Sequence, residues 1–410
     1  EYRRKNGLGI GDKSSRLLLN HVIAEVFARS AREVGRELVV DDFGKLLNAG
    51  GLEVAQAVGA YEWGRPIGAL PAQSDFLRVE ELGVLTAFFS GLPLARTPRA
   101  FALTGMSGIG KTSLAASYAH RYSARYDWIL WIDASTSESI RSSIAPTISD
   151  DTASLTDDDL RAKFHARLGR SPGSWLLVFD NAAHADAIHS WLPSVGHIDV
   201  ISTSTDANGW SQWQSSMVNT MSTKESFNLI LIRLDLQEPG LGDEEREQLH
   251  QLAEELDGWP LAIELACAYL SSARRTTGLT RDYIRALRTR VVDDESLVPP
   301  SYRTHRTLTA AVLLAVDQLR NVPATTSGLS PIGVLDALSY LPAREAPTLI
   351  AMRSAILSAN IRVGESSQDT VQIEVPVSTP TPSSIQIDDV LRALNQTSLV
   401  ERFTAAGTDT

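Results

Sequence analysis

Short apolar runs alternate with helix-like segments through the middle of the chain, from about residue 74 to residue 235. This alternation is typical of a parallel β-sheet whose strands are connected by helices. Five runs are predicted as strands, and all but the last end in polar residues: 100–104, 128–132, 175–179, 199–203 and 230–234. Because ligands of open α/β sheets bind outside the carboxyl ends of the strands, a site is expected at these polar endings.

Helical patterns precede and follow this region. Before it, Leu19, Val22, Ile23, Val26 and Phe27 recur at the spacing of one helix face. Two interpretations of this amino-terminal segment stay open: a small helical packing unit, or an effector remnant or helix-turn-helix.

After the predicted sheet, residues 238–270 read as helical, with a break at Gly258-Trp259-Pro260. Further helices are predicted up to about residue 290, from 302 to 319, and over 388–395. Residues 364–386 are rich in Ser, Thr and Pro, which predicts an exposed loop. Residues 398–403 are predicted as a strand.

Composition narrows the possible classes of protein. The chain has 410 residues, of which 43% are hydrophobic and 21% charged, values typical of a globular protein of about two to four domains. The net charge of −11 gives no basic footprint for nucleic acid, so DNA is not expected as a partner. A single cysteine, Cys267, excludes an intramolecular disulfide. No apolar stretch reaches the roughly twenty residues of a membrane helix, and we expect a cytoplasmic protein without a membrane partner.

The most specific motif is the octet of residues 105–112, which fits the phosphate-loop pattern G-x-x-x-x-G-K-[ST] between a predicted strand and a predicted helix at 113–120. Its glycines let the backbone N–H groups face a phosphate, Lys111 can reach the outer phosphates, and the Thr112 hydroxyl can bind Mg²⁺. A glycine turn without nucleotide is the simpler alternative. The predicted nucleotide-binding residues here are Gly105, Met106, Ser107, Gly108, Ile109, Gly110, Lys111, Thr112 and Ser113.

A second acidic position completes the predicted site. Asp180 follows the apolar run 175–179, where a carboxylate can hold Mg²⁺ opposite Thr112; the alternative is a helix cap. We therefore predict Lys111 and Asp180 as catalytic residues, and Thr112 and Asp180 as metal ligands. The next residue is Asn181, whose amide cannot take a proton from an attacking water, so slow turnover is expected.

Several motifs together resemble a known family. The octet, Trp131-Ile132-Asp133, the run 176–181, the run 200–204 and Gly258-Trp259-Pro260-Leu261-Ala262 occur in the order found in the NB-ARC module of the STAND class of P-loop NTPases. The resemblance covers roughly residues 74–403. It departs from the family at Thr205, where an arginine that senses the γ-phosphate is expected, and at Arg78, which is one position away from the usual arginine of this segment.

The resemblance implies an α/β P-loop NTPase domain with a parallel five-stranded sheet, then a small helical domain and a winged-helix domain, after a short helical segment. The expected limits are 1–68 for the amino-terminal segment and linker, 69–236 for the nucleotide-binding domain, 237–300 for the helical domain and 301–410 for an incomplete winged helix. It also implies that Pro260 packs against the adenine or ribose. The family's ADP-binding histidine would fall beyond Thr410, so we expect a piece of a longer protein.

The function implied is a signalling switch: an ADP-bound closed state exchanges ADP for ATP and then self-associates, with slow Mg²⁺-dependent hydrolysis. The expected ligands are ATP or ADP and Mg²⁺. Two alternatives stay open. One is a nucleotide-regulated transcription factor or DNA-binding scaffold, and the other is a P-loop kinase or transferase that acts on a small molecule.

Overall fold

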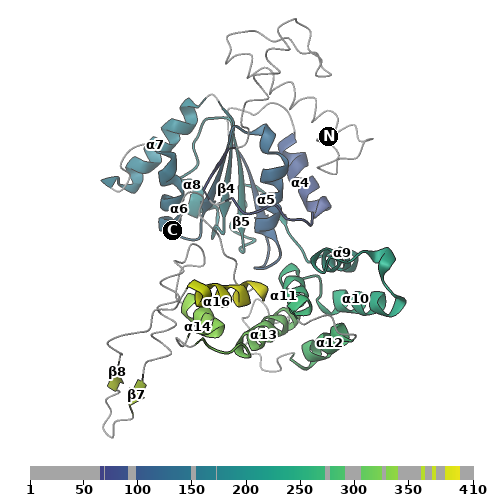
Figure 1. Ribbon diagram of the computed structural model, residues 1–410. Coiled ribbons are helices and arrows are strands. Elements are labelled where there is room, and N and C mark those ends of the chain that lie inside the picture. Colours follow the sequence, from purple (N-terminus) through teal and green to yellow (C-terminus); the bar gives the residue numbers. More distant parts are fainter. Residues whose placement is uncertain are drawn as a thin grey trace, which may run out of the picture. The chain divides into compact units, whose positions relative to one another are not determined.

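The computed structural model describes residues 65–68, 70–90, 98–148, 154–171, 173–272, 278–290, 306–325, 329–339, 362–364, 372–374 and 384–397. The chain divides into two compact units, Glu1–Asn219 and Thr220–Thr410 (Figure 1). The predicted amino-terminal helices and the predicted strand at 398–403 lie outside the described residues. The limits of the four predicted domains stay predictions.

The first unit is built on a parallel sheet. Within the described residues the sheet has six strands, in the order β1-β3-β4-β5-β2-β6 (Figure 1). The strands are β1 (Arg65–Ile67), β2 (Arg99–Thr104), β3 (Trp128–Asp133), β4 (Trp175–Asp180), β5 (Ile198–Ser204) and β6 (Gln214–Met217). All of these pairings are parallel. The first four predicted strands are therefore confirmed as β2, β3, β4 and β5.

The prediction of a five-stranded sheet, with its last strand at residues 230–234, was wrong. Residues 230–233 belong to helix α9 (Thr223–Arg233) in the second unit, and Leu234 is the C-cap of this helix. A capping box begins the helix, because the Ser222 hydroxyl accepts from the Glu225 N–H and the Glu225 carboxylate accepts from the Ser222 N–H. Ile230 and Leu231 lie on the buried side of this helix, whereas Ile232 is exposed, and the edge strands β1 and β6 complete the sheet instead.

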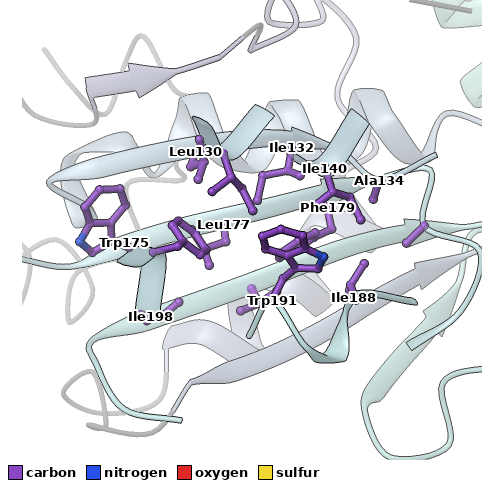
Figure 2. Close-up of a cluster of buried hydrophobic side chains, with 14 of the residues drawn as sticks. Leu130, Ile132, Ala134, Ile140, Trp175, Leu177, Phe179, Ile188, Trp191 and Ile198 are labelled. Atoms are coloured by element: carbon purple, nitrogen blue, oxygen red, sulfur yellow. The ribbon is translucent and has the colours of Figure 1, made fainter. Parts of the chain in front are cut away.

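Helices cover both faces of the sheet. Figure 1 shows α4 (Val79–Ser90) and α5 (Lys111–Arg121) on one side, and α6 (Ser137–Ile144), α7 (Asp157–Arg170) and α8 (Ala185–His189) on the other. The second side forms a large hydrophobic cluster, in which Leu177 and Phe179 of β4 pack with residues of α6 and α7 (Figure 2). Burial on both faces explains why the strands read as continuous apolar runs.

A buried ion pair fixes the register at the amino ends of β2 and β5. The guanidinium of Arg99 donates from Nε and Nη2 to the two carboxylate oxygens of Asp199, each across 2.8 Å. The hydroxyl of Tyr126 donates to the same carboxylate across 2.7 Å. Burial raises the pKa of Asp199, although Arg99 and Arg125 oppose this. The network lies at the end of the strands opposite the phosphate loop and holds β2 beside β5.

The second unit is mainly helical. Its helices within the described residues are α9, η4 (Glu238–Gly240), α10 (Asp243–Glu255), α11 (Pro260–Ser272), α12 (Leu279–Thr289), α13 (Arg306–Arg320), α14 (Pro331–Leu338) and α16 (Ser384–Gln396). The predicted helices over 238–270, up to 290 and over 388–395 are confirmed, and the one predicted over 302–319 is confirmed for its described residues, which begin at Arg306. Strands β7 (Arg362–Gly364) and β8 (Gln372–Glu374) form an antiparallel pair. The last residue of β7, all of β8 and the start of α16 fall within the stretch 364–386 that was predicted as a loop.

No described helix combines the length and the apolar composition that a membrane crossing requires.

Candidate nucleotide-binding site

The octet forms the turn between β2 and α5. Gly105 follows β2, and Gly110 is the N-cap of α5 with a left-handed φ of 96°. Gly105 has a φ of 143°, and a Cβ on it would lie 2.7 Å from the carbonyl oxygen of Val218. Glycine is therefore required at the start of the loop for both conformation and space. The following helix directs its positive end toward the loop, as an anion site needs.

The ammonium group of Lys111 is held inside the loop. Its Nζ donates to the carbonyl oxygens of Gly105 and Met106, each across 2.8 Å. Burial lowers the pKa of Lys111 to about 8, against the opposing effect of Asp180. The charge thus lies where the loop turns, within reach of an anion that its N–H groups would bind.

The structure brings Thr112 and Asp180 together. The Thr112 hydroxyl donates to Oδ1 of Asp180 across 2.8 Å, and the Thr203 hydroxyl donates to the same oxygen across 2.5 Å. Thr203 also accepts from the backbone N–H of Asn181 across 2.9 Å. Asp180 is wholly buried. It does not cap the next helix, because α8 begins at Ala185 with His184 as its N-cap.

This donor set fits Mg²⁺. A hydroxyl and a carboxylate are oxygen ligands, and Mg²⁺ in phosphate sites takes one or two carboxylates together with phosphate and water oxygens. Among the described residues no group of three or more His, Cys, Asp or Glu could hold a metal by itself. A magnesium ion here would be held by Thr112 and Asp180 together with the nucleotide.

Two other predicted positions have local roles. Asp133 accepts from the backbone N–H of Ser135 across 3.0 Å, so its carboxylate stabilises the turn after β3. Thr205 is exposed, and the hydroxyl of Ser204 donates to the carbonyl oxygen of Ala183. Near the end of β5, Thr203 is hydrogen-bonded to Asp180.

Asn181 has a left-handed backbone conformation, with a φ of 64°. Asn and Asp tolerate this conformation better than other residues with a Cβ. Its side chain is exposed directly after Asp180. An amide therefore occupies the position where a second acid would polarise water.

Sequence reasoning did not identify a role for Arg78, which precedes α4. Its side chain is 6% exposed, and its Nη1 donates to the carbonyl oxygens of Ile109, across 3.3 Å, and Asn219, across 2.8 Å. Its Nη2 forms an ion pair with Glu81. Ile109 belongs to the phosphate loop, so Arg78 stabilises the loop through a hydrogen bond to its backbone. Glu81 three residues after an arginine was the one local hint in the sequence.

Pro260 begins α11 in the second unit. Proline fits the first turn of a helix, where its missing N–H has no partner to lose. The preceding Gly258 has a φ of 69°, and a Cβ on it would lie 2.1 Å from the carbonyl oxygen of Met221. The nucleotide contact of Pro260 stays a prediction.

No family model and no curated protein matches the chain. Solved structures with similar chains include the ORC2 protein of Aeropyrum pernix in ADPNP–ADP complexes, at 16% identity and a TM-score of 0.42, with 81% of this chain and 89% of that chain covered. A second is a STAND protein with a tetratricopeptide repeat sensor from Pyrococcus horikoshii, at 14% identity and a TM-score of 0.36; the match covers 80% of this chain and 46% of that one. A third is Drosophila ORC bound to DNA, at 14% identity, a TM-score of 0.40 and coverages of 80% and 89%.

Proposed function

We propose that the chain binds an adenine nucleotide with Mg²⁺ at the loop of residues 105–112 and acts as a slow ATPase switch of the STAND type. The observation that carries the proposal is the meeting of three groups at one end of the sheet: the Lys111 ammonium, the Thr112 hydroxyl and the buried Asp180 carboxylate. Lys111 and Thr112 begin α5 and Asp180 ends β4, and the combination of the three groups suits a phosphate chain with its metal.

Each residue has a distinct part in nucleotide binding. The glycine-rich backbone offers N–H groups to the phosphates, and Lys111 adds a positive charge at the outer phosphates. Thr112 and Asp180 would hold Mg²⁺, which when bound neutralises charge on the phosphate oxygens. Thr203 orients the Asp180 carboxylate through its 2.5 Å hydrogen bond.

Slow hydrolysis follows from the residues beside the acid. Asn181 cannot accept a proton from water, and Asp133 is engaged in the turn that includes Ser135. The site therefore offers groups that bind phosphate and Mg²⁺, but the residue directly after Asp180 is an amide and Asp133, beside Asp180 on β3, already bonds the turn after its strand. Slow hydrolysis of a bound nucleotide suits a switch whose ATP-bound state must last longer than it would in a fast ATPase.

The switch itself belongs to the proposal as well. ADP would favour a closed state with its adenine or ribose against Pro260, and exchange for ATP would favour self-association. A ligand can shift this equilibrium only through different interactions with the two states. The expected division into nucleotide-binding, helical and winged-helix domains supplies separate parts that a nucleotide could hold together.

The alternative of a DNA-binding scaffold finds little support in the basic stretch at residues 281–290. Arg281 pairs with Glu244, Arg285 with Asp282, Arg288 with Glu255 and Arg290 with Asp317. The affinity of proteins for DNA comes largely from contacts of arginine and lysine with phosphates. Because each of these arginines is paired with an acid of the same unit, the stretch does not present a row of unneutralised positive charges.

The test is nucleotide binding by the purified chain and by Lys111→Ala. The wild-type chain should carry or bind ADP, detected by mass spectrometry and titration, and Lys111→Ala should lose it. The matched control is Lys163→Ala, which changes an exposed lysine on α7 of the same unit. ADP retained by Lys111→Ala would contradict the proposal.

A further inference from the structure

We infer that Arg78 couples the phosphate loop to the joining segment, residues 218–221, where the first unit passes into the second. The inference rests on the proposed nucleotide binding and adds a positioning residue to it. Nucleotide at the loop would then change the stability of the joining segment.

The first observation is the double contact of the Arg78 guanidinium. One nitrogen, Nη1, donates both to the carbonyl oxygen of Ile109 in the loop and to that of Asn219 in the joining segment. The planar guanidinium fixes the directions of its donors, so the two carbonyls are held in a defined relation. The ion pair with Glu81 holds the other side of the group.

The second observation is a direct backbone contact between the joining segment and the start of the loop. The Val218 N–H donates to the carbonyl oxygen of Thr104 across 2.8 Å. The Val218 carbonyl lies so near Gly105 that a Cβ there would be 2.7 Å from its oxygen. The joining segment therefore runs along the first residue of the loop without space between them.

The third observation ties the same segment to the second unit. The Met221 N–H donates to the carbonyl oxygen of Gly258 across 2.8 Å. Gly258 lies just before Pro260 and α11. A single residue, Thr220, separates Asn219 from Met221, so few backbone dihedrals lie between the Arg78 contact and the bond to Gly258.

Phosphate binding would change the hydrogen bonds that Lys111 makes within the phosphate loop. The Lys111 ammonium donates to the carbonyls of Gly105 and Met106, and an anion in the loop would compete for those donors. A change of partners at Gly105 and Met106 reorients the peptides that lead to Ile109. A movement of the Ile109 carbonyl would shift the Arg78 guanidinium and with it the hydrogen bond to Asn219, because the same nitrogen donates to both carbonyl oxygens.

The experiment is hydrogen exchange, followed by mass spectrometry, of the peptide that covers residues 216–224 in the 410-residue chain, with and without saturating ADP. The variants are Arg78→Met, which removes the donors, and Arg78→Lys, which keeps the charge and can reach one carbonyl. The control is Glu81→Gln, which removes the ion pair but leaves the carbonyl contacts of Arg78. ADP affinity is measured for each protein so that exchange is compared at equal occupancy.

We expect ADP to slow exchange of this peptide about tenfold in the wild-type chain, as the loss of one local opening mode would. The effect should be nearly absent in Arg78→Met, intermediate in Arg78→Lys, and retained in Glu81→Gln. Arg78→Met should also bind ADP about tenfold more weakly, which is what one lost hydrogen bond to a charged group gives.

Two outcomes overturn the inference. One is equal slowing by ADP in the wild-type chain, Arg78→Met and Arg78→Lys; if Arg78→Met does not fold, full slowing in Arg78→Lys has the same meaning. The other is ADP binding by the wild-type chain with no change in exchange, which refutes the coupling and leaves nucleotide binding intact. A wild-type chain that binds no nucleotide refutes the proposed function itself.

Discussion

The Thr112 hydroxyl lies 2.8 Å from Oδ1 of Asp180, although β5 runs between the strand before Thr112 and the strand that ends at Asp180. Thr203, near the end of β5, donates to the same carboxylate oxygen. Two hydroxyls from neighbouring segments therefore converge on one buried acid. This convergence makes the carboxyl end of β4 the centre of the candidate site.

We expect Asp180→Asn to remove the effect of Mg²⁺ on ATP binding. The amide keeps the shape of the side chain but not the negative charge that a hard cation needs. In titration calorimetry, Mg²⁺ should strengthen ATP binding by the wild-type chain by about tenfold or more, a difference of about 1.4 kcal/mol. Asp180→Asn should bind ATP equally with Mg²⁺ and with a chelator.

The control for this experiment is Asp133→Asn, which neutralises the acid that ends the neighbouring strand β3. It should retain the dependence on Mg²⁺. An unchanged Mg²⁺ effect in Asp180→Asn would remove Asp180 from the metal site.

Lys111 makes ADP affinity dependent on pH. Burial lowers its pKa to about 8 in the folded chain without nucleotide, and phosphate binding needs the charged form. Between about pH 7 and about pH 9 the affinity should therefore fall by about tenfold, because one unit above the pKa roughly nine-tenths of the lysine is neutral. Fluorescence titration with a labelled ADP across this range measures the change.

The stability of the nucleotide-free chain should move in the opposite direction. The pKa of Lys111 is about 8 in the folded chain and 10.5 for an ordinary lysine. Between about pH 8 and about pH 10.5, Lys111 is therefore more often protonated in the unfolded chain than in the folded chain, and this group makes the free energy of unfolding rise with pH. Lys111→Arg keeps its charge and should show neither trend. The same fall of affinity in Lys111→Arg would assign it to another group.

The central part of the fold could be predicted because its strands are buried on both faces. The runs that became β2 to β5 are apolar and bounded by turn residues. Strand β6 reads Gln-Ser-Ser-Met and lies at the edge of the sheet, where no apolar pattern is required. Strand β1 contains Pro66, which fits an edge strand but looks like a linker in sequence.

The mistaken strand shows a different limit. The run at residues 230–234 is apolar enough for a strand, and its period alone does not separate strand from helix. The signal that favours a helix comes before the run, in Ser222 and Glu225, whose spacing matches the capping box that begins a helix. Weighing that start signal against the apolar run would have favoured the helix.

The candidate site was predictable where one motif contains the chemistry. The octet and Asp180 follow from local sequence, and the structure brings them together. The contact of Arg78 with Ile109 and Asn219 joins segments far apart in the chain, and no local pattern encodes such a contact. The position of Thr203 between two strands likewise depends on the strand order.

A single substitution should raise the rate of ATP hydrolysis. Asn181→Asp places a carboxylate directly after Asp180, and the left-handed backbone there, with a φ of 64°, accepts Asp as it accepts Asn. A positioned general base contributes about a hundredfold or more to such reactions, so we expect at least about a tenfold increase in the rate of phosphate release.

The control is Asn181→Gly, which removes the amide without adding an acid, accepts the left-handed conformation, and should leave the rate unchanged within about twofold. ADP affinity should stay near that of the wild-type chain in both variants. Equal rates in Asn181→Asp and Asn181→Gly would show that the slow step lies elsewhere.

Gly258→Ala should destabilise the second unit more than Gly278→Ala does. Both glycines have left-handed backbone conformations, with φ of 69° and 91°, so each substitution incurs strain of about 1 kcal/mol. A Cβ at Gly258 would also lie 2.1 Å from the carbonyl oxygen of Met221, whereas one at Gly278 meets no atom of the described residues within 4 Å. The contact cannot be relieved without moving the backbone, which raises the expected loss for Gly258→Ala to about 3 kcal/mol.

Urea unfolding followed by tryptophan fluorescence measures both variants, because Trp259 is buried beside the substituted glycine. Equal midpoints for the two variants would mean that the close approach of Met221 to Gly258 is relieved without loss of stability.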